Sequence, residues 1–405
     1  MVDSIHLVVV VGAGPVGLTT ALDLAQNGIR VLVLESGAEQ VPAQWRGSTI
    51  HPPTLEIFNE LGLAETIIAG AVKVETLQYR DLEIPIVANF SYGCLEDKVR
   101  YPFRLQFEQY KLLKLLRVAS IEHPNIEISY STEVLSVIRE TDKVLIEVVQ
   151  DGKSLTIQSQ WLVGADGSHS VIRKGLDIGL DGFTYQHPTT VVATSFPFDK
   201  YIDDLAPVSY WSGPLGRLSM IKTPDVWRIA MTIQQKENDD LAGDSGSLLS
   251  PSNEFLQAIA LLLKWIPGSD LADLKIQQYE TYRSHQRIAR EFAVGRVALA
   301  GDAAHLTSTN GGMGLNSGVQ DAAALSGYLR EAIKNQTTEP LHKYANEREA
   351  FCKDFLQPTT TENHQSVDSS NSEIRLDRLL TLQGQSKDNE ATLKVVRRAS
   401  MLLKL

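Results

Sequence analysis

The feature that most restricts the fold of this chain is its N-terminal segment, IHLVVVVGAGPVGL, residues 5–18. The near-continuous apolar run over 5–11 predicts a strand that is buried on both faces, and a helix is expected over 18–26. A second strand is expected over 30–34, and Glu35 closes it. Strand, Gly-x-Gly-x-x-Gly turn, helix, strand and acidic residue form the complete dinucleotide-binding pattern, so the sequence predicts an α/β fold with a Rossmann-type sheet.

Each glycine of this turn has an expected physical role. Gly12 permits the tight turn, Gly14 lets a pyrophosphate approach the backbone, and Gly17 lets helix and strand pack closely. Glu35 can accept both hydroxyls of a ribose and would repel a 2′-phosphate, so NADP is not expected here. The pattern alone does not separate FAD from NAD. The residues expected to contact the dinucleotide are Gly12, Gly14, Pro15, Gly17, Glu35 and Ser36.

Charge and cysteine content argue against other classes of partner. The chain has 38 Lys+Arg against 49 Asp+Glu and no long basic run, which argues against nucleic acid. Cys94 and Cys352 form neither a metal-ligand spacing nor a disulfide framework, so we expect no metal site and a reducing, cytoplasmic location. The apolar run over 7–11 is too short for a signal core or an integral membrane segment.

Two further glycine–aspartate motifs lie far downstream. WLVGADGSHS, residues 161–170, predicts a strand that enters an Asp-Gly turn, and GRVALAGD, residues 295–302, predicts a strand that ends in Gly-Asp. With these motifs in this order, the chain resembles the class A flavoprotein monooxygenases, the para-hydroxybenzoate hydroxylase-like FAD-dependent aromatic hydroxylases. The resemblance covers residues 5–350 and implies FAD as the cofactor, bound non-covalently.

The resemblance assigns a role to the loop GGMGLN, residues 311–316. In the family, the aspartate of the Gly-Asp motif, Asp302 here, binds the ribityl chain of FAD, and the loop lies against the isoalloxazine edge. A helix that starts near Ser317 would direct its free N–H groups at the flavin and stabilise its anionic reduced form. Arg173 either orients Asp166 or forms a surface ion pair. The further residues that the resemblance places at FAD are Arg46, Gly47, Gln109, Asp166, Gly312, Gly314, Leu315 and Asn316.

The chain between these motifs predicts a second domain. Residues 72–77 alternate as in a half-buried strand, 84–87 read as an edge strand, and short strands recur from 189 to 233. We expect a discontinuous, glutathione-reductase-like FAD-binding domain (1–71, 101–180 and 281–345) and an inserted mixed β-sheet substrate domain (72–100 and 181–280). A C-terminal helical region (346–405) follows. Its basic amphipathic end, 389–405, is expected to pack on the core or on a partner subunit, with membrane contact as the alternative.

The resemblance places the substrate between this second sheet and the flavin. Tyr210 and Trp211 are candidates for an aromatic wall, with core packing as the alternative, and Thr309 is a further candidate for substrate contact. His51 is the candidate catalytic residue, as a base or hydrogen-bond partner for a phenol, with a surface or capping role as the alternative. His305 is expected to support its loop and not a metal. Which face of the strand over 227–233 looks inward stays open.

These inferences predict an FAD-dependent aromatic monooxygenase, or hydroxylase. The resemblance implies that NADH or NADPH reduces the flavin, that O2 then forms a C4a-hydroperoxyflavin, and that a small phenolic or hydroxylated N-heteroaromatic substrate is hydroxylated. Alternatives of the same fold are a flavin-dependent halogenase, an isoprenoid reductase and a non-catalytic FAD redox module. KWIP at 264–267 only superficially resembles the Trp-x-Trp-x-Ile-Pro segment of a halogenase. A homodimer is compatible with the sequence.

Overall fold

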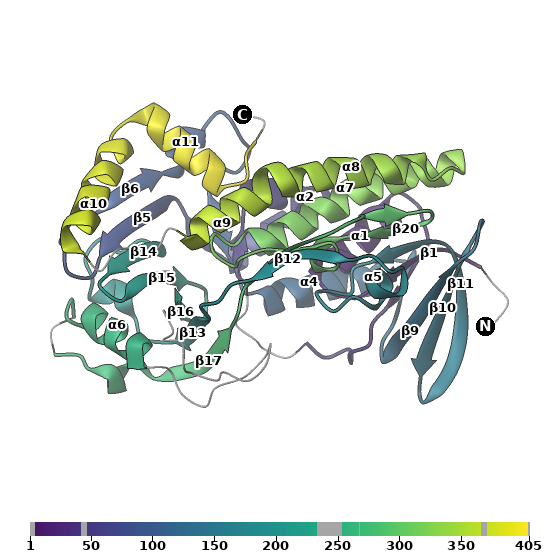
Figure 1. The fold of residues 1–405 in the computed structure, drawn as a ribbon, viewed down its shortest axis with the longest axis horizontal. Helices are drawn as coiled ribbons and strands as arrows, with labels where there is room; N and C mark the ends of the chain where they lie inside the picture. Colours follow the sequence, from purple (N-terminus) through teal and green to yellow (C-terminus); the bar gives the residue numbers. More distant parts are fainter. Residues whose placement is uncertain (1–4, 42–46, 233–252, 267, 366–370, 404–405) are drawn as a thin grey trace.

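Two large sheets occupy opposite ends of the molecule, and helices bridge them along one side (Figure 1). The computed structural model describes residues 5–41, 47–232, 253–266, 268–365 and 371–403. The mixed α/β architecture predicted from the N-terminal pattern is confirmed.

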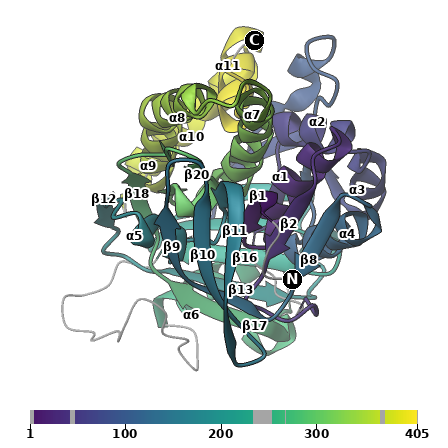
Figure 2. The same cartoon turned by 90° about the vertical axis from the view of Figure 1, so that its right-hand side faces the viewer.

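The first sheet is built around strand β1 (His6–Val11), whose Val8, Val9 and Val10 are fully buried because helices and strands cover both of its faces. Four other strands run parallel to it in the order β20-β11-β1-β2-β8. An antiparallel extension is formed by β9 and β10, and β19 pairs with β20 (Figure 2). The bounds are β2 (Val31–Leu34), β8 (Ile126–Ser129), β9 (Thr132–Arg139), β10 (Val144–Gln150), β11 (Lys153–Gly164), β19 (Ala293–Val294) and β20 (Val297–Leu299).

Two helices that pack on the first sheet approach each other closely at a glycine. A Cβ on Gly318 would lie 2.7 Å from a methyl carbon of Val16, so α1 (Pro15–Gln26) and α7 (Met313–Asn335) make close contact at this glycine. The other helices of this part are α2 (Pro52–Glu60), α3 (Ala64–Gly70), α4 (Gln109–Glu122), α5 (Val171–Gly175) and α8 (Glu339–Phe351).

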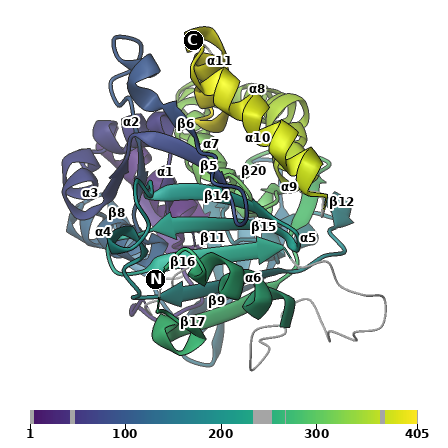
Figure 3. The ribbon, with the colours of Figure 1, turned by 90° about the vertical axis from the view of Figure 1, so that its left-hand side faces the viewer.

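The second sheet has seven strands in the order β17-β13-β16-β15-β14-β5-β6, and helix α6 (Asn253–Leu263) covers one of its faces (Figure 3). Trp227, Ile229 and Met231 of β16 belong to the core cluster that contains Phe255 and Leu262 of α6. The sequence did not show which face of the strand over 227–233 looks inward. In the structure one face packs against α6, and the alternate residues of β16 point away from α6. The bounds are β5 (Thr76–Asp81), β6 (Ala88–Ser91), β13 (Thr189–Thr194), β14 (Val208–Gly213), β15 (Gly216–Lys222), β16 (Trp227–Thr232) and β17 (Ile276–Tyr282).

Two three-stranded sheets connect the large ones. One has the order β3-β7-β4 and the other the order β12-β18-β21. Their bounds are β3 (Thr49–Ile50), β4 (Val72–Val74), β7 (Arg104–Gln106), β12 (Leu180–Thr184), β18 (His285–Ala289) and β21 (His305–Leu306). The domain boundaries predicted from the sequence remain our proposal. Strands β4 and β12 belong to these connecting sheets and not to either large sheet.

Three local expectations were wrong. Residues 84–87 form a loop, and the strand begins only at Ala88, after the proline at 85. The single strand expected over 72–77 is divided between two sheets, because β4 pairs with β7 and β5 pairs with β14. Helix α7 begins at Met313 and not near Ser317, because Gly311 and Gly312, both at positive φ, complete the turn before it.

The C-terminal helices α9 (Gln357–Gln365), α10 (Ser372–Ser386) and α11 (Asn389–Ala399) pack on the second sheet's end of the molecule (Figure 3). Val396 of α11 is fully buried in a cluster with Phe90 and Leu95, so this helix packs on the core. Arg375 of α10 donates to Asp81 at 2.8 Å. Within the described residues, no helix is both long enough and apolar enough to cross a bilayer.

Candidate active site

Parallel pairing brings the predicted cofactor residues to one edge of the first sheet. Val11 is in register with Leu34 and with Gly164, and Gly164 is in register with Leu299. The carboxyl ends of β1, β2, β11 and β20 therefore lie side by side. The segments that follow them carry the Gly-rich turn, Glu35, the Asp-Gly motif and the Gly-Asp motif, so motifs up to 290 residues apart in the sequence (12 to 302) share one edge.

The glycine-rich turn is tight on its inner side and open on its outer side. Gly12 has φ +103°, and a Cβ there would lie 2.4 Å from the carbonyl oxygen of Ala165. A Cβ on Gly17 would lie 1.9 Å from the carbonyl oxygen of Gly12. At Gly14 a Cβ would meet no atom within 4 Å, and no side chain caps the helix α1 that begins at Pro15. This combination leaves free N–H groups beside an open space, the arrangement that binds phosphate.

Glu35 is held against this turn by backbone donors. Its Oε2 accepts a hydrogen bond from the Ala13 N–H at 2.7 Å, and its Oε1 accepts one from the Gly37 N–H at 2.7 Å. Ser36 lies beside it and is exposed. The carboxylate is thus fixed next to the start of α1, where the ribose of a dinucleotide would lie.

Asp166 and Arg173 build the Asp-Gly turn. The Asp166 Oδ2 atom accepts from the N–H groups of Val171 (2.7 Å) and Ile172 (3.1 Å), which begin α5. Arg173 is buried and donates to the carbonyl oxygens of Ala303 (3.1 Å) and Ser168 (3.1 Å). Arg173 therefore does not orient Asp166 by a hydrogen bond and does not form a surface ion pair. It links the Asp-Gly motif to the Gly-Asp motif.

Asp302 differs from the other motif residues, because its side chain is exposed and has no hydrogen bond or ion pair to any described residue. Behind it, His305 contacts the buried Asp321 through Nε2 at 2.6 Å. Asp321 also accepts from Arg348 Nε at 2.6 Å and from the Gly301 N–H at 3.0 Å. The Gly-Asp turn thus rests on a buried charged cluster, and Asp302 remains available to a ligand.

The loop before α7 presents an uncapped helix start. Gly312 is the N-cap residue and supplies no side-chain hydrogen bond, so the first N–H groups of α7, at Met313, Gly314 and Leu315, have no helical partner. The Asn316 side chain is fully buried; it accepts from the His51 N–H at 2.8 Å and donates to the Thr49 carbonyl at 2.9 Å. The Asn316 amide therefore positions the loop, and the predicted contact of this residue with FAD stays a prediction.

Gly47 and Gln109 also meet. The Gln109 N–H donates to the Gly47 carbonyl at 2.9 Å, and a Cβ on Gly47 would lie 3.2 Å from Oε1 of Gln109. Gln109 begins helix α4. Arg46, the other predicted residue of this segment, lies outside the described residues.

His51 does not have the surroundings of a base. Its side chain is fully buried, and its Nε2 donates to the Gly311 carbonyl at 3.1 Å. Burial, and secondarily the positive charge of Arg104, lower the pKa of His51 to about 3. His51 is also absent from the cavity lining described below, so we replace its predicted catalytic role with a structural one.

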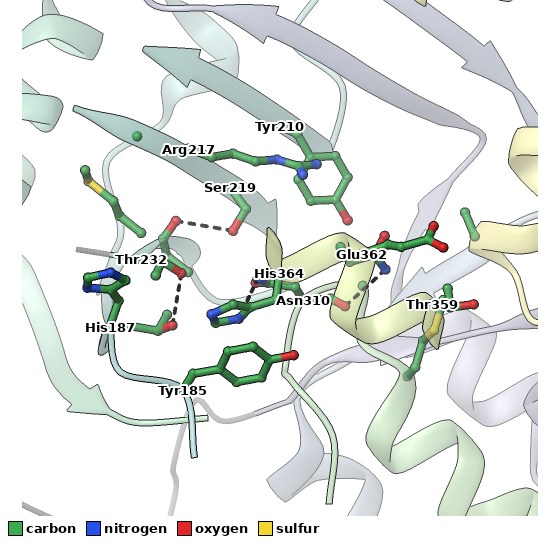
Figure 4. Close-up of a pocket in the computed structure, with 18 of the residues that line it drawn as sticks. Tyr185, His187, Tyr210, Arg217, Ser219, Thr232, Asn310, Thr359, Glu362 and His364 are labelled. Carbon is green, nitrogen blue, oxygen red and sulfur yellow. Dashed lines mark hydrogen bonds between the residues drawn. The ribbon is translucent and has the colours of Figure 1, made fainter. Parts of the chain in front are cut away.

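A cavity of about 530 Å³ lies between the second sheet, the loop before α7 and the C-terminal helices. Tyr210 and Arg217 extend into it from β14 and β15, and Glu362 and His364 line it from α9 (Figure 4). Gly311 and Met313 form its border with the predicted flavin site. The cavity therefore adjoins the site at which the isoalloxazine edge is expected.

The predicted substrate residues have different positions. Tyr210 lines the cavity, as expected. Trp211 points to the opposite face, is fully buried in the α6 cluster, and is part of the core and not of an aromatic wall. Thr309 is exposed outside the lining, and its hydroxyl lies 3.0 Å from that of Tyr282. Sequence reasoning missed Tyr79, Arg104, Arg217 and His364, which carry no local motif.

The residues present fit FAD. The open turn at Gly14, the carboxylate of Glu35, the carboxylate of Asp302 and the uncapped start of α7 lie along one edge. Each supplies the donor or acceptor type that a pyrophosphate, a ribose, a ribityl chain or an electron-rich ring edge requires.

Comparisons with known proteins agree with this geometry. Residues 6–359 match the family described as FAD binding domain. The chain is 31% identical to para-nitrophenol 4-monooxygenase of Pseudomonas sp. (strain WBC-3), over 89% of this chain and 87% of that protein. It is also 31% identical to 6-hydroxy-3-succinoylpyridine 3-monooxygenase of Pseudomonas putida (strain DSM 28022 / S16), over 88% and 87%. The crystal structure of p-nitrophenol 4-monooxygenase from Pseudomonas putida DLL-E4 superimposes with a TM-score of 0.86 at 26% identity, over 98% of both chains.

Proposed function

Because the chain belongs to the FAD-binding-domain family, and with it to the class A flavoprotein monooxygenases, we propose that it hydroxylates a small phenolic or hydroxylated N-heteroaromatic ring. It is an FAD-dependent aromatic monooxygenase. The observation that carries the finer proposal is the cavity of about 530 Å³ beside the start of α7. Its size lies within the range of about 300–1,000 Å³ that is usual for small-molecule sites.

In the proposed reaction the chain positions and shields the reactants. Glu35 and Asp302 would hold the ribose and the ribityl chain, and the N–H groups at the start of α7 would stabilise negative charge at the ring edge. Bound FAD would supply the redox chemistry that activates O2 with electrons from NADH or NADPH. Tyr79 and Tyr210 would hold the substrate ring in the cavity, where packed side chains limit the access of water.

The names of two relatives support the substrate class. One acts on a nitrophenol and the other on a hydroxypyridine, and these are the two ring types that we propose. A halogenase is disfavoured by the position of the Lys264–Ile266 segment. The indole of Trp265 donates to the Leu82 carbonyl at 2.9 Å and packs beside Trp211, so this segment lies across the second sheet from the cavity.

The test is a panel of phenols and hydroxypyridines, each scored for stimulated oxidation of NADH or NADPH and for a product that has gained one oxygen atom. We expect stimulation and oxygen insertion with at least one member. NAD(P)H oxidation that no aromatic compound stimulates would support a redox module instead. Incorporation of chloride or bromide would support a halogenase, and saturation of an isoprenoid double bond would support a reductase.

A further inference from the structure

The cavity is larger than one aromatic ring requires. Its volume is about 530 Å³, whereas a cavity of about 150 Å³ in a protein core is enough to hold benzene. None of the residues predicted to contact FAD is in its described lining, so this volume lies beside the expected cofactor edge and not within it. A phenol or hydroxypyridine alone would therefore leave most of the cavity empty.

The cavity extends across the second sheet. Its floor takes residues from the adjacent strands β16, β15, β14 and β5, among them Ala230, Ser219, Tyr210 and Tyr79 in that order. These four residues are paired in register, so their side chains form one row on the face opposite α6. Adjacent strands are about 4.8 Å apart, so the row spans about 14 Å. The cavity is thus elongated along this row.

One end of the row is apolar and is closed by the C-terminal helix α11. Leu77 lies two residues before Tyr79 on β5 and therefore on the same face of the sheet. Val395 and Ala399 of α11 are four residues apart, lie on one side of the helix, and line the cavity together with Leu77. Both also pack against the buried cluster that contains Leu77. Helix α11 is therefore a wall of the cavity as well as part of the fold.

The charged side chains near this end are engaged with other groups or turned away. Arg398 of α11 pairs with Glu362 of α9 at 2.5 Å, and both side chains are exposed. The Arg217 guanidinium lies 4.5 Å from the ring centre of Tyr210. The Nε and Nη2 atoms of Arg104 are buried and sealed from the cavity. The surface that this end offers to a ligand is therefore mainly apolar and aromatic.

We propose that the end of the cavity at Leu77, Val395 and Ala399 is a subsite for an apolar substituent, and that this chain acts on phenols or hydroxypyridines that carry a group such as an alkyl chain. The proposal rests on the proposed function and makes its substrate class more specific. Tyr79 and Tyr210 would hold the ring, and α11 would receive the substituent that extends beyond them. Val395 and Ala399 are then specificity-determining residues, although they lie outside the segment that carries the cofactor motifs.

The test measures ligand binding to the FAD-loaded enzyme without NAD(P)H, through the change in flavin absorbance. The ligands are phenol and two series of alkylphenols, substituted at position 3 or at position 4, from methyl to hexyl. Each buried CH₂ group should tighten binding by about three- to fourfold. In at least one series the affinity should therefore rise by at least about 30-fold from methyl to hexyl. A smaller rise in both series would overturn the proposal.

A variant places the gain in affinity at α11. Ala399→Phe fills the apolar end with a ring and should remove the gain, while the affinity for phenol should not change. Ala391→Phe adds the same ring to the same helix outside the described cavity lining, and it should keep the wild-type affinities for the whole series. A gain that persists in Ala399→Phe would mean that the substituent binds elsewhere on the protein, and it would overturn the proposal.

Folding of the variants is checked by their FAD content and Tm. Val395→Phe fills the same end of the cavity from the preceding turn of α11, and it decides the matter if Ala399→Phe does not retain its FAD. The series on the wild-type enzyme needs no variant.

The proposal fails separately from the proposed function, because binding is measured without turnover. The expected rise in affinity, in a protein that hydroxylates no aromatic compound, would overturn the proposed function and leave the subsite in place. Hydroxylation of phenol, together with a smaller rise in both series, would leave the proposed function in place and overturn the subsite.

Discussion

Asp302 keeps its carboxylate free of hydrogen bonds to the described chain, whereas the nearby Asp166 and Asp321 are engaged by helix N–H groups and by buried cations. This contrast supports our proposal that Asp302 binds a ligand and that Asp166 and Asp321 have structural roles. We expect that an exposed acid without a hydrogen bond or ion pair to the described chain can be changed without unfolding the protein.

We therefore expect Asp302→Asn to lower FAD affinity by about 10- to 100-fold, because a hydrogen bond to a charged acceptor contributes about 1.5–3 kcal/mol. FAD titration of the apoprotein measures the change, and thermal unfolding of the same apoprotein should be unaffected. Equal FAD affinity in the variant and the wild type would remove Asp302 from the ribityl site.

His51 gives a pH-dependent prediction. Its folded-state pKa of about 3 lies below the ordinary value of 6.5, so below pH 6.5 the unfolded chain binds a proton that the folded chain does not. Stability is therefore lost as the pH falls. Between about pH 7 and pH 5 the loss from this group is about 2 kcal/mol.

His51→Gln should remove this contribution while keeping a donor to the Gly311 carbonyl. Urea unfolding at both pH values, for the wild type and the variant, gives the difference. His169→Gln, at an exposed position, controls for the loss of a histidine as such. Parallel pH dependence in wild type and His51→Gln would show that folding does not lower the pKa of His51.

At the scale of elements, Asp321 joins three parts of the fold. It stands on α7, contacts Arg348 of α8 and His305 of β21, and accepts from the Gly301 N–H at the Gly-Asp turn. Burial raises the pKa of Asp321, but Arg348 and His305 together lower it more strongly. Asp321 is therefore ionised in the folded protein. Two long helices and the cofactor edge thus depend on one carboxylate.

Asp321→Asn should lower the free energy of unfolding by about 3–5 kcal/mol, because it leaves a buried arginine without its counter-charge. Glu339→Gln, which breaks an exposed pair with Lys343 on α8, is the matched control and should leave stability unchanged. Denaturant unfolding of both apoproteins decides the matter. Equal stability of the two variants would mean that the cluster does not hold α7 to α8.

At the scale of the molecule, the sequence predicted the first sheet better than the cavity. Strand β1, helix α1 and strand β2 were readable because a buried strand, a glycine turn and a closing acid follow one another within 31 residues (5–35). The start of α7 was misplaced because positive φ at Gly311 and Gly312 permits a helix directly after them. A sequence pattern within a short segment predicts the geometry of that segment only.

The cavity could not be read in the same way. Tyr79, Arg104, Arg217 and His364 come from four elements, β5, β7, β15 and α9. Whether a strand residue faces the cavity depends on register, and a shift of one residue reverses the face. Tyr210 and Trp211 show this directly, since these neighbours point to opposite faces, one to the cavity and one to the core.

The pairing order of the first sheet also governs how the protein is made. Strand β1 is complete at residue 11, yet its neighbour β11 pairs with it through residues such as Ser159, and β20 joins only at 297–299. Because the chain leaves the ribosome N-terminus first, the apolar strand β1 emerges about 150 residues of synthesis before its partner β11. Contacts of such long sequence separation fold slowly. The cofactor edge is then among the last parts of the nascent protein to form, after most of the chain has been translated.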